Sequence, residues 1–335
     1  MDYGAFSFTV VGRRVLNGFR GLGYVSTHLI NPYFSFFIAK YSLLTYIGDT
    51  VHGVKSGFLR RLRNYADVFV YWTDSIIDLE HLSDSDINFL NENCINFSTS
   101  KYYCGKMVER GMRVDGVVGR PIPEEVVREV LSMGDGVFRE KFGKYILTVG
   151  RDPTIAKHPR KGFDRFDEAI GLIRGELKRR NIKTVAVSNW IFRNVDVKIE
   201  SGTLSEIDVF RLYRDAMLFI FPSRGEGFGL PPLEAMSVGT PVVYTDVPSH
   251  NEFTVGIPVE AEYKPLMEYS SLGLRWEVWD YDSKPLAQTI LYAIELIERG
   301  DEEIWKLRLK AMERAMEYCE RKIVEKLMEE AMAKI

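Results

Sequence analysis

Short apolar runs alternate with segments of helical periodicity through the second half of the chain, and this alternation constrains the fold more than any other feature. Each run closes at a glycine, a proline or a polar turn, as a buried strand does. Strands that alternate with helices form βαβ units, so we expect an α/β fold with a parallel sheet and helices on both faces. The predicted strands are 144–149, 184–188, 218–221 and 241–244, and the predicted helices between them are 164–180, 207–216 and 233–238.

The first half of the chain carries a weaker version of the same pattern. A glycine-bearing turn follows the first candidate strand and leads into a predicted helix at 24–30. The polar segment 124–142 is predicted to be helical. The candidate strands are 6–11, 66–71, 93–98 and 114–118.

Two domains are expected, because 335 residues exceed what one core usually supports. We place a short N-terminal domain at 1–140 and a second domain at 141–300. The tail, 301–335, is amphipathic and is predicted to form one long helix or a broken pair. We expect this tail to pack back on the N-terminal domain.

Composition excludes several classes of protein. The net charge of −3 gives no reason to expect nucleic acid as a partner. The three cysteines, Cys94, Cys104 and Cys319, form no CxxC pair, which argues against a zinc site or a disulfide framework and favours a cytoplasmic location. No apolar run is long enough to span a bilayer, and the N-terminus lacks a signal-peptide pattern.

Gln288 is the only glutamine in the chain, whereas glutamate and lysine are abundant. Depletion of thermolabile amides together with many charged residues is typical of proteins from thermophiles. Chance or genome composition is the alternative explanation.

The segment 221–236 has the composition of a ligand-binding turn between a strand and a helix. Its glycines permit a close approach of the backbone to a ligand, and the free N–H groups at a helix start favour an anion such as a diphosphate. Glu226 and Glu234 can accept hydrogen bonds from the hydroxyls of a sugar and a ribose. A purely structural strand–helix turn, with Glu234 stabilising the positive helix end, is an equally good interpretation of these residues alone.

Together with residues 237–243, this segment resembles the signature of the retaining GT-B glycosyltransferases of family 4 (group 1). That signature is a Glu-x7-Glu pair within EGFGLP-x-LEAM-x-x-G-x-PVV, and the chain matches it with Glu226 and Glu234. The resemblance implies two Rossmann-like, doubly wound domains that face each other across a cleft. It implies transfer of a hexose from a UDP-, GDP- or ADP-linked sugar with retention of configuration, and no cofactor or metal ion.

The resemblance also implies roles for individual residues. Glu226 would contact the transferred sugar, and Glu234 would bind the ribose hydroxyls. The backbone beside the sugar would come from Gly227, Phe228, Gly229 and Leu230, and the nucleobase would lie against Thr203 and Leu204.

Two basic residues upstream resemble the Gly-Arg…Lys-Gly pair of the same family. Arg151 and Lys161 would neutralise the diphosphate of the donor in place of a metal ion as the leaving group departs. Lys157 competes with Lys161 for this role. Taken in isolation, these residues are better explained as solvated surface cations.

The first domain matches the family less closely. Gly21 and Gly23 are the nearest candidates for the glycine-rich loop that the family places after its first strand. His52 is the candidate for a histidine near the transferred sugar, with His28 as another, although most histidines in aromatic-rich domains have a structural role. The resemblance covers 141–295 well and 93–123 loosely.

An aromatic segment at 32–47 is followed by Lys55, Arg60, Arg61 and Arg63. One interpretation is a peripheral patch that docks on the anionic inner face of a membrane to reach a lipid-linked acceptor. The other is a core helix followed by a basic surface helix. The acceptor itself, whether saccharide, lipid or protein, is left open by the sequence.

Three other functions compete with glycosyl transfer. A dinucleotide-dependent oxidoreductase needs a GxGxxG turn with a downstream acidic residue, and no such unit occurs. A glycoside phosphorylase with the GT-B fold and a non-catalytic nucleotide-sugar-binding protein remain as alternatives.

Overall fold

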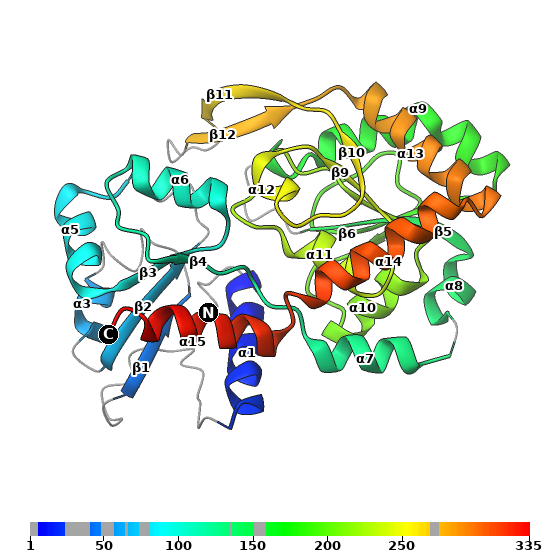
Figure 1. Cartoon of the computed structure of the whole chain (residues 1–335). Coiled ribbons are helices and arrows are strands. Elements are labelled where there is room, and N and C mark those ends of the chain that lie inside the picture. The colour runs from blue at the N-terminus through cyan, green and yellow to red at the C-terminus, as the bar shows by residue number, and fades with distance from the viewer. Residues whose placement is uncertain are drawn as a thin grey trace. The chain divides into compact units, whose positions relative to one another are not determined.

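The computed structural model describes residues 6–23, 41–47, 57–63, 66–73, 79, 81–134, 136–150, 159–268 and 275–335. The chain divides into two compact units, each built around its own parallel sheet (Figure 1). The smaller unit comprises Met1–Pro121 with Tyr318–Ile335, and the larger unit comprises Ile122–Glu317. The predicted α/β fold class is confirmed. Within the described part of the chain, no helix is long and apolar enough to cross a membrane.

The larger unit contains a six-stranded sheet in the order β10-β9-β8-β5-β6-β7 with every neighbouring pair parallel. The chain builds one half of this sheet outward from β5, then returns to place β8 on the other side of β5. All four predicted strands of this half are present within a few residues. The bounds are β5 (Lys144–Val149), β6 (Ile182–Val187), β7 (Val197–Ile199), β8 (Leu218–Phe221), β9 (Val242–Thr245) and β10 (Ile257–Val259).

Helices cover both faces of this sheet because its strands are apolar on both sides. Ile146 and Ile220 point to a core shared with α9 (Phe163–Arg179) and α13 (Ser283–Arg299). On the opposite face Tyr145 donates a hydrogen bond to the Leu212 carbonyl 2.6 Å away. That face carries α10 (Glu206–Asp215), α11 (Leu230–Ser237), α7 (Glu124–Ser132), α8 (Val137–Phe142) and α14 (Glu302–Met316).

A two-stranded antiparallel hairpin, formed by β11 (Glu262–Glu268) and β12 (Arg275–Asp280), follows β10. We call it the arm (Figure 1). Tyr263 pairs with Trp279 across the two strands, with ring centroids 5.4 Å apart. The sequence pattern did not predict the arm, because it has neither regular alternation nor a recognisable tight turn.

The smaller unit contains a parallel sheet in the order β1-β2-β3-β4. Three of its strands fall where strands were predicted. Its elements are α1 (Phe6–Gly21), β1 (Tyr41–Tyr46), α3 (Phe58–Leu62), β2 (Ala66–Thr73), α5 (Asp84–Asn93), β3 (Ile95–Ser98), α6 (Lys101–Glu109), β4 (Gly116–Val117) and α15 (Glu320–Met332).

The strand predicted at 6–11 is wrong, because these residues open helix α1. Its buried positions are Val11, Arg14, Val15 and Gly18, which recur at helical spacing. An arginine and a glycine occupy two of these positions, so the apolar periodicity of the helix is hidden in the sequence. The arginine side chain is satisfied by a hydrogen bond to the Pro121 carbonyl at 3.1 Å.

The interpretation of 32–47 as a core helix is also wrong for residues 41–47, the part of this range that the structure describes. Residues 41–46 form β1, which pairs in parallel with β2. Its sequence, YSLLTY, contains β-favouring tyrosine and threonine. The helix predicted at 24–30 lies outside the described residues.

The tail is a broken pair of helices that is shared between the units. α14 packs on α11 in the larger unit, and α15 packs on α1 in the smaller one. Helices α7 and α8 also belong to the larger unit. The chain therefore passes from one compact unit to the other after residue 121 and returns after residue 317, whereas the expected boundaries were 140 and 300.

We predict that Gly18→Ala destabilises the smaller unit. A Cβ atom at Gly18 would lie 2.6 Å from Val324 Cγ2 and 2.7 Å from the Glu320 carbonyl oxygen, so α1 and α15 would have to separate. The free energy of unfolding should fall by about 1–3 kcal/mol in urea denaturation. Gly21→Ala is the matched control, since no atom lies within 4 Å of its Cβ position. Equal stability of the two variants would contradict the close packing.

Candidate functional site

The chain reverses its direction of sheet growth between β5 and β8, and segments from both strand ends meet there. In open α/β sheets, ligands bind outside the carboxyl ends of the strands at such a switch point. The short 3-10 turn Pro159–Lys161, after β5, lies against the loop 222–229, after β8. These two segments carry the site.

Gly162 allows the two segments to meet. Its φ is +65°, and a Cβ atom there would lie 1.8 Å from the Pro222 carbonyl oxygen. The Arg224 amide donates to the Arg160 carbonyl at 2.7 Å. The turn is therefore fixed directly on the loop.

Glu226 lies at the centre of this contact and is 9% exposed. Arg160 Nη1 is 2.5 Å from Oε2, and Lys161 Nζ is 2.6 Å from Oε1. The Ser223 hydroxyl donates to Oε1 at 2.9 Å. Burial by itself raises the pKa of the Glu226 carboxyl, but the charges of Arg160 and Lys161 outweigh it and hold that pKa well below its usual range. Glu226 is thus an ionised carboxylate.

His250 lies beside this carboxylate in α12 (Pro248–Asn251) and is fully buried. Its Nδ1–H donates to the Thr245 carbonyl at 3.1 Å, which leaves Nε2 as an acceptor without a hydrogen-bond partner among the described residues. The ring packs on Phe221 with centroids 4.7 Å apart. Burial lowers the pKa of His250 to about 4 against the opposing charge of Glu226, so the imidazole is neutral.

Glu234 lies one turn into α11, where the Tyr213 hydroxyl donates to Oε2 at 3.2 Å. The helix starts after Gly229, whose φ of +103° and close approach to Phe221 favour glycine. Phe228 is buried against Phe253, with centroids 4.5 Å apart, so its ring has a structural role. Both glutamates of the pair therefore belong to one continuous loop and helix.

The other predicted site residues fall in different places. Arg151, Lys157, His28 and His52 lie outside the described residues. Thr203 and Leu204 lie in the turn between β7 and α10, where the Thr203 hydroxyl donates to the Glu200 carbonyl at 2.8 Å.

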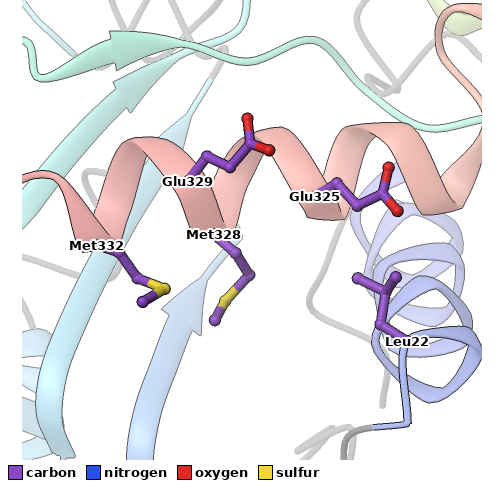
Figure 2. Close-up of a pocket in the computed structure, with 5 residues that line it drawn as sticks. All are labelled: Leu22, Glu325, Met328, Glu329 and Met332. Atoms are coloured by element: carbon purple, nitrogen blue, oxygen red, sulfur yellow. The ribbon is translucent and has the colours of Figure 1, made fainter.

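Gly21 and Gly23 belong to the end of helix α1 in the smaller unit. The expectation of a glycine-rich loop after a first strand is therefore wrong here, since a helix precedes these glycines. Near them, a hollow of about 290 Å³ is lined by Leu22, Glu325, Met328, Glu329 and Met332 (Figure 2). Two carboxylates and, among the residues that the structure describes, no cation line this hollow, so it does not suit a diphosphate.

Sequence reasoning missed Arg160, Ser223 and His250. Arg160 precedes Lys161 directly, and a second cation beside the first was the available signal. His250 follows a predicted strand by a few residues, which places it at the carboxyl edge of the sheet. Nothing in the sequence showed that either side chain is buried.

We predict that Gly162→Ala disrupts the site more than its change in size suggests. The added methyl group meets the Pro222 carbonyl, and the positive φ is unfavourable for alanine. The free energy of unfolding should fall by at least about 2 kcal/mol, measured by chemical denaturation. Gly175→Ala, in the open interior of α9, should be neutral or stabilising. A fully stable Gly162→Ala variant would show that the two segments do not meet as described.

Acidification is predicted to weaken the fold from about pH 6.5 downward, because the unfolded chain then binds more protons at His250 than the folded one. This contribution is at most about 3 kcal/mol and is lost by about pH 4. The lowered pKa of Glu226 adds a further loss below its unfolded pKa of about 4.3. His250→Gln should flatten the upper part of this dependence in urea titrations at successive pH values. His81→Gln, in the smaller unit, serves as the control, and an unchanged slope in His250→Gln would refute the assignment.

The comparison with protein families gives one match. Residues 143–262 match the model described as glycosyl transferases group 1. This range contains every residue of the site from Arg160 to His250.

Curated relatives agree with this match. "Putative glycosyltransferase 48" of Sulfolobus islandicus filamentous virus is 29% identical over 264 residues, which cover 77% of this chain and 75% of the relative. The lipopolysaccharide core biosynthesis mannosyltransferase LpsB of Rhizobium meliloti is 57% identical over 44 residues, which cover 13% of this chain and 12% of the relative.

Solved structures share the fold. HepE from Anabaena, in complex with UDP and glucose, superposes with a TM-score of 0.61 at 16% identity, covering 88% of this chain and 78% of that one. The E. coli trehalose-6-phosphate protein bound with UDP-2-fluoro glucose superposes with a TM-score of 0.64 at 9% identity, covering 90% and 76%. Residues 143–262 therefore match the group 1 glycosyltransferases, and the chain shares the fold of these solved GT-B structures.

Proposed function

We propose that this enzyme transfers a hexose from a nucleotide diphosphate sugar to an acceptor with retention of anomeric configuration. One observation carries the proposal: the ionised Glu226 is held by two cations at the carboxyl ends of β5 and β8. This cluster combines positive charge for a diphosphate with a carboxylate for sugar hydroxyls.

Lys161 and Arg160 would bind the donor diphosphate, together with Arg151 from the family pattern. In the structure these two cations are paired with Glu226. A diphosphate would compete for them, and its charge would replace part of the Glu226 contact. Fixed side-chain cations would then stabilise the leaving group in place of a metal ion.

Glu226 would accept a hydrogen bond from the transferred sugar, beside the backbone of Gly227, Phe228, Gly229 and Leu230. Its lowered pKa makes it a weak base and a weak nucleophile. This supports front-face attack assisted by the leaving phosphate rather than a covalent intermediate on Glu226. Glu234 would bind the ribose, and Thr203 and Leu204 would lie against the nucleobase.

The acceptor would be a saccharide, a lipid or a protein. The basic residues proposed for membrane contact have structural partners in α3 and after it. Arg60 lies over the Phe89 ring at 4.3 Å and pairs with Asp86 at 3.6 Å, while Arg63 donates to the Ala66 carbonyl at 2.8 Å. These contacts favour the interpretation of this segment as a basic surface helix and argue against a membrane-docking patch. We still propose that the enzyme is cytoplasmic and that it contacts the inner face of the membrane through other residues.

A thermal-shift panel tests the donor. A ligand that binds only the native state raises the melting temperature, so one of the UDP-, GDP- or ADP-sugars should stabilise the protein. UDP and UDP-glucose are the first probes because HepE is solved with them. Release of the nucleotide then measures transfer, and a strict requirement for inorganic phosphate would instead indicate a phosphorylase. Failure of every nucleotide sugar to bind would refute the proposal.

We predict that Glu226→Gln lowers transfer by at least about 100-fold, since the sugar loses its positioning contact. Without ligand the variant should melt at a lower temperature, because Arg160 and Lys161 lose their counter-charge. UDP should therefore raise the melting temperature of the variant more than that of the wild type. Glu200→Gln, at an exposed position of the same unit, is the control. Full transfer by Glu226→Gln would exclude the assigned role.

A further inference from the structure

The arm begins where the match to the family model ends. The matched region closes at residue 262, and β11 starts at Glu262. A two-stranded hairpin is only marginally stable by itself, so its contacts with the rest of the unit matter. These contacts lie on the loop that carries Glu226.

Two backbone positions of the loop receive hydrogen bonds from the end of the arm. The Trp279 amide donates to the Arg224 carbonyl at 2.9 Å. The Tyr281 hydroxyl, just after β12, donates to the Pro222 carbonyl at 2.5 Å. A Cβ atom on Gly225 would lie 3.3 Å from the Glu277 carbonyl oxygen, so the two backbones pass close to each other.

The Arg224 side chain adds a buried ionic contact between the same elements. It is 5% exposed, and its Nε lies 2.9 Å from Asp280 at the end of the arm. Its Nη2 lies 2.9 Å from Asp164 in the first turn of α9. One guanidinium thus joins the loop to both the arm and α9, which suits the planar fork of arginine.

Asp280 is ionised in this contact. Burial by itself raises the pKa of its carboxyl, but the hydrogen bond from Arg165 and the charge of Arg224 bring that pKa below its usual value. Arg165 lies 3.3 Å from Asp280 and 3.3 Å from Glu168. It therefore shares the carboxylate with Arg224.

The position of Arg224 links the arm to the cations of the site. Its amide donates to the Arg160 carbonyl at 2.7 Å, and Glu226 follows two residues later. Ser223, on its other side, donates to Glu226. A displacement of residue 224 would move Glu226 relative to Arg160 and Lys161.

We propose that Arg224 is a positioning residue and that the arm is part of the active-site machinery, holding the loop 222–226 so that Glu226 meets the donor sugar in one geometry. The inference rests on the proposed role of Glu226. It assigns the arm a function in the rate of transfer rather than in nucleotide affinity, because Glu234 and the nucleobase contacts lie outside the contacts between the arm and the loop.

The test compares Arg224→Met with Arg165→Met. Both remove one arginine from the same carboxylate, but only Arg224 belongs to the loop. With UDP-glucose, or the panel sugar that the wild type uses, kcat of Arg224→Met should fall by about 10–100-fold. The Kd for the nucleotide and the KM for the donor should stay close to wild-type values. Arg165→Met should keep the wild-type kcat, and Arg224→Lys, which can reach one carboxylate, should recover part of the rate.

Hydrogen–deuterium exchange gives a readout that needs no donor. Peptides covering 222–228 should exchange faster in Arg224→Met and in Asp280→Asn than in Arg165→Met. If Arg224→Met does not fold, Tyr281→Phe removes one contact between the end of the arm and the loop with a minimal change. This variant should show the same fall in kcat and the same faster exchange. Equal kcat and equal exchange in the Arg224 and Arg165 variants, or a parallel loss of nucleotide binding, would overturn the inference. A wild type that uses no nucleotide sugar would refute the proposed function, and exchange alone would then decide whether Arg224 holds the loop.

Discussion

The contact between the Gly162 backbone and the Pro222 carbonyl is the constraint on which the rest of the site depends. It brings the turn after β5 onto the loop after β8, so that Arg160 and Lys161 reach Glu226. Because the position tolerates no Cβ atom, the Lys-Gly pair of the sequence has a direct geometric cause. The glycine allows the two segments to approach each other, and the lysine supplies a positive charge beside Glu226.

The electrostatics of the site follow from that approach. A carboxylate buried between two cations stays ionised, and a buried imidazole beside it stays neutral. The carboxylate proposed to contact the sugar and the cations proposed to bind the diphosphate are thus held together. Preorganised charge of this kind needs little rearrangement when a leaving group develops its own charge.

The loop bearing Glu226 is held from two sides. The turn around Arg160 contacts it on one side, and the end of the arm contacts it through Trp279, Asp280 and Tyr281 on the other. The first contact lies within the region matched by the family, and part of the second lies beyond it. The loop that carries Glu226 is therefore also held by an element that begins where the matched region ends, at residue 262.

The sequence by itself determined the four central strands of the larger unit and the turn between Glu226 and Glu234, because these strands are apolar on both faces and glycines and prolines mark the turn. The short edge strands β7 and β10 were not predicted. It misplaced α1, where Arg14 and Gly18 occupy buried positions and hide the helical period. Only the tertiary structure decided that Arg160 joins Lys161 in pairing with Glu226, that His250 lies beside this carboxylate, and that the end of the arm contacts the loop. These contacts join residues up to 66 positions apart, and their partners are chosen by backbone approach and burial, which local composition does not encode.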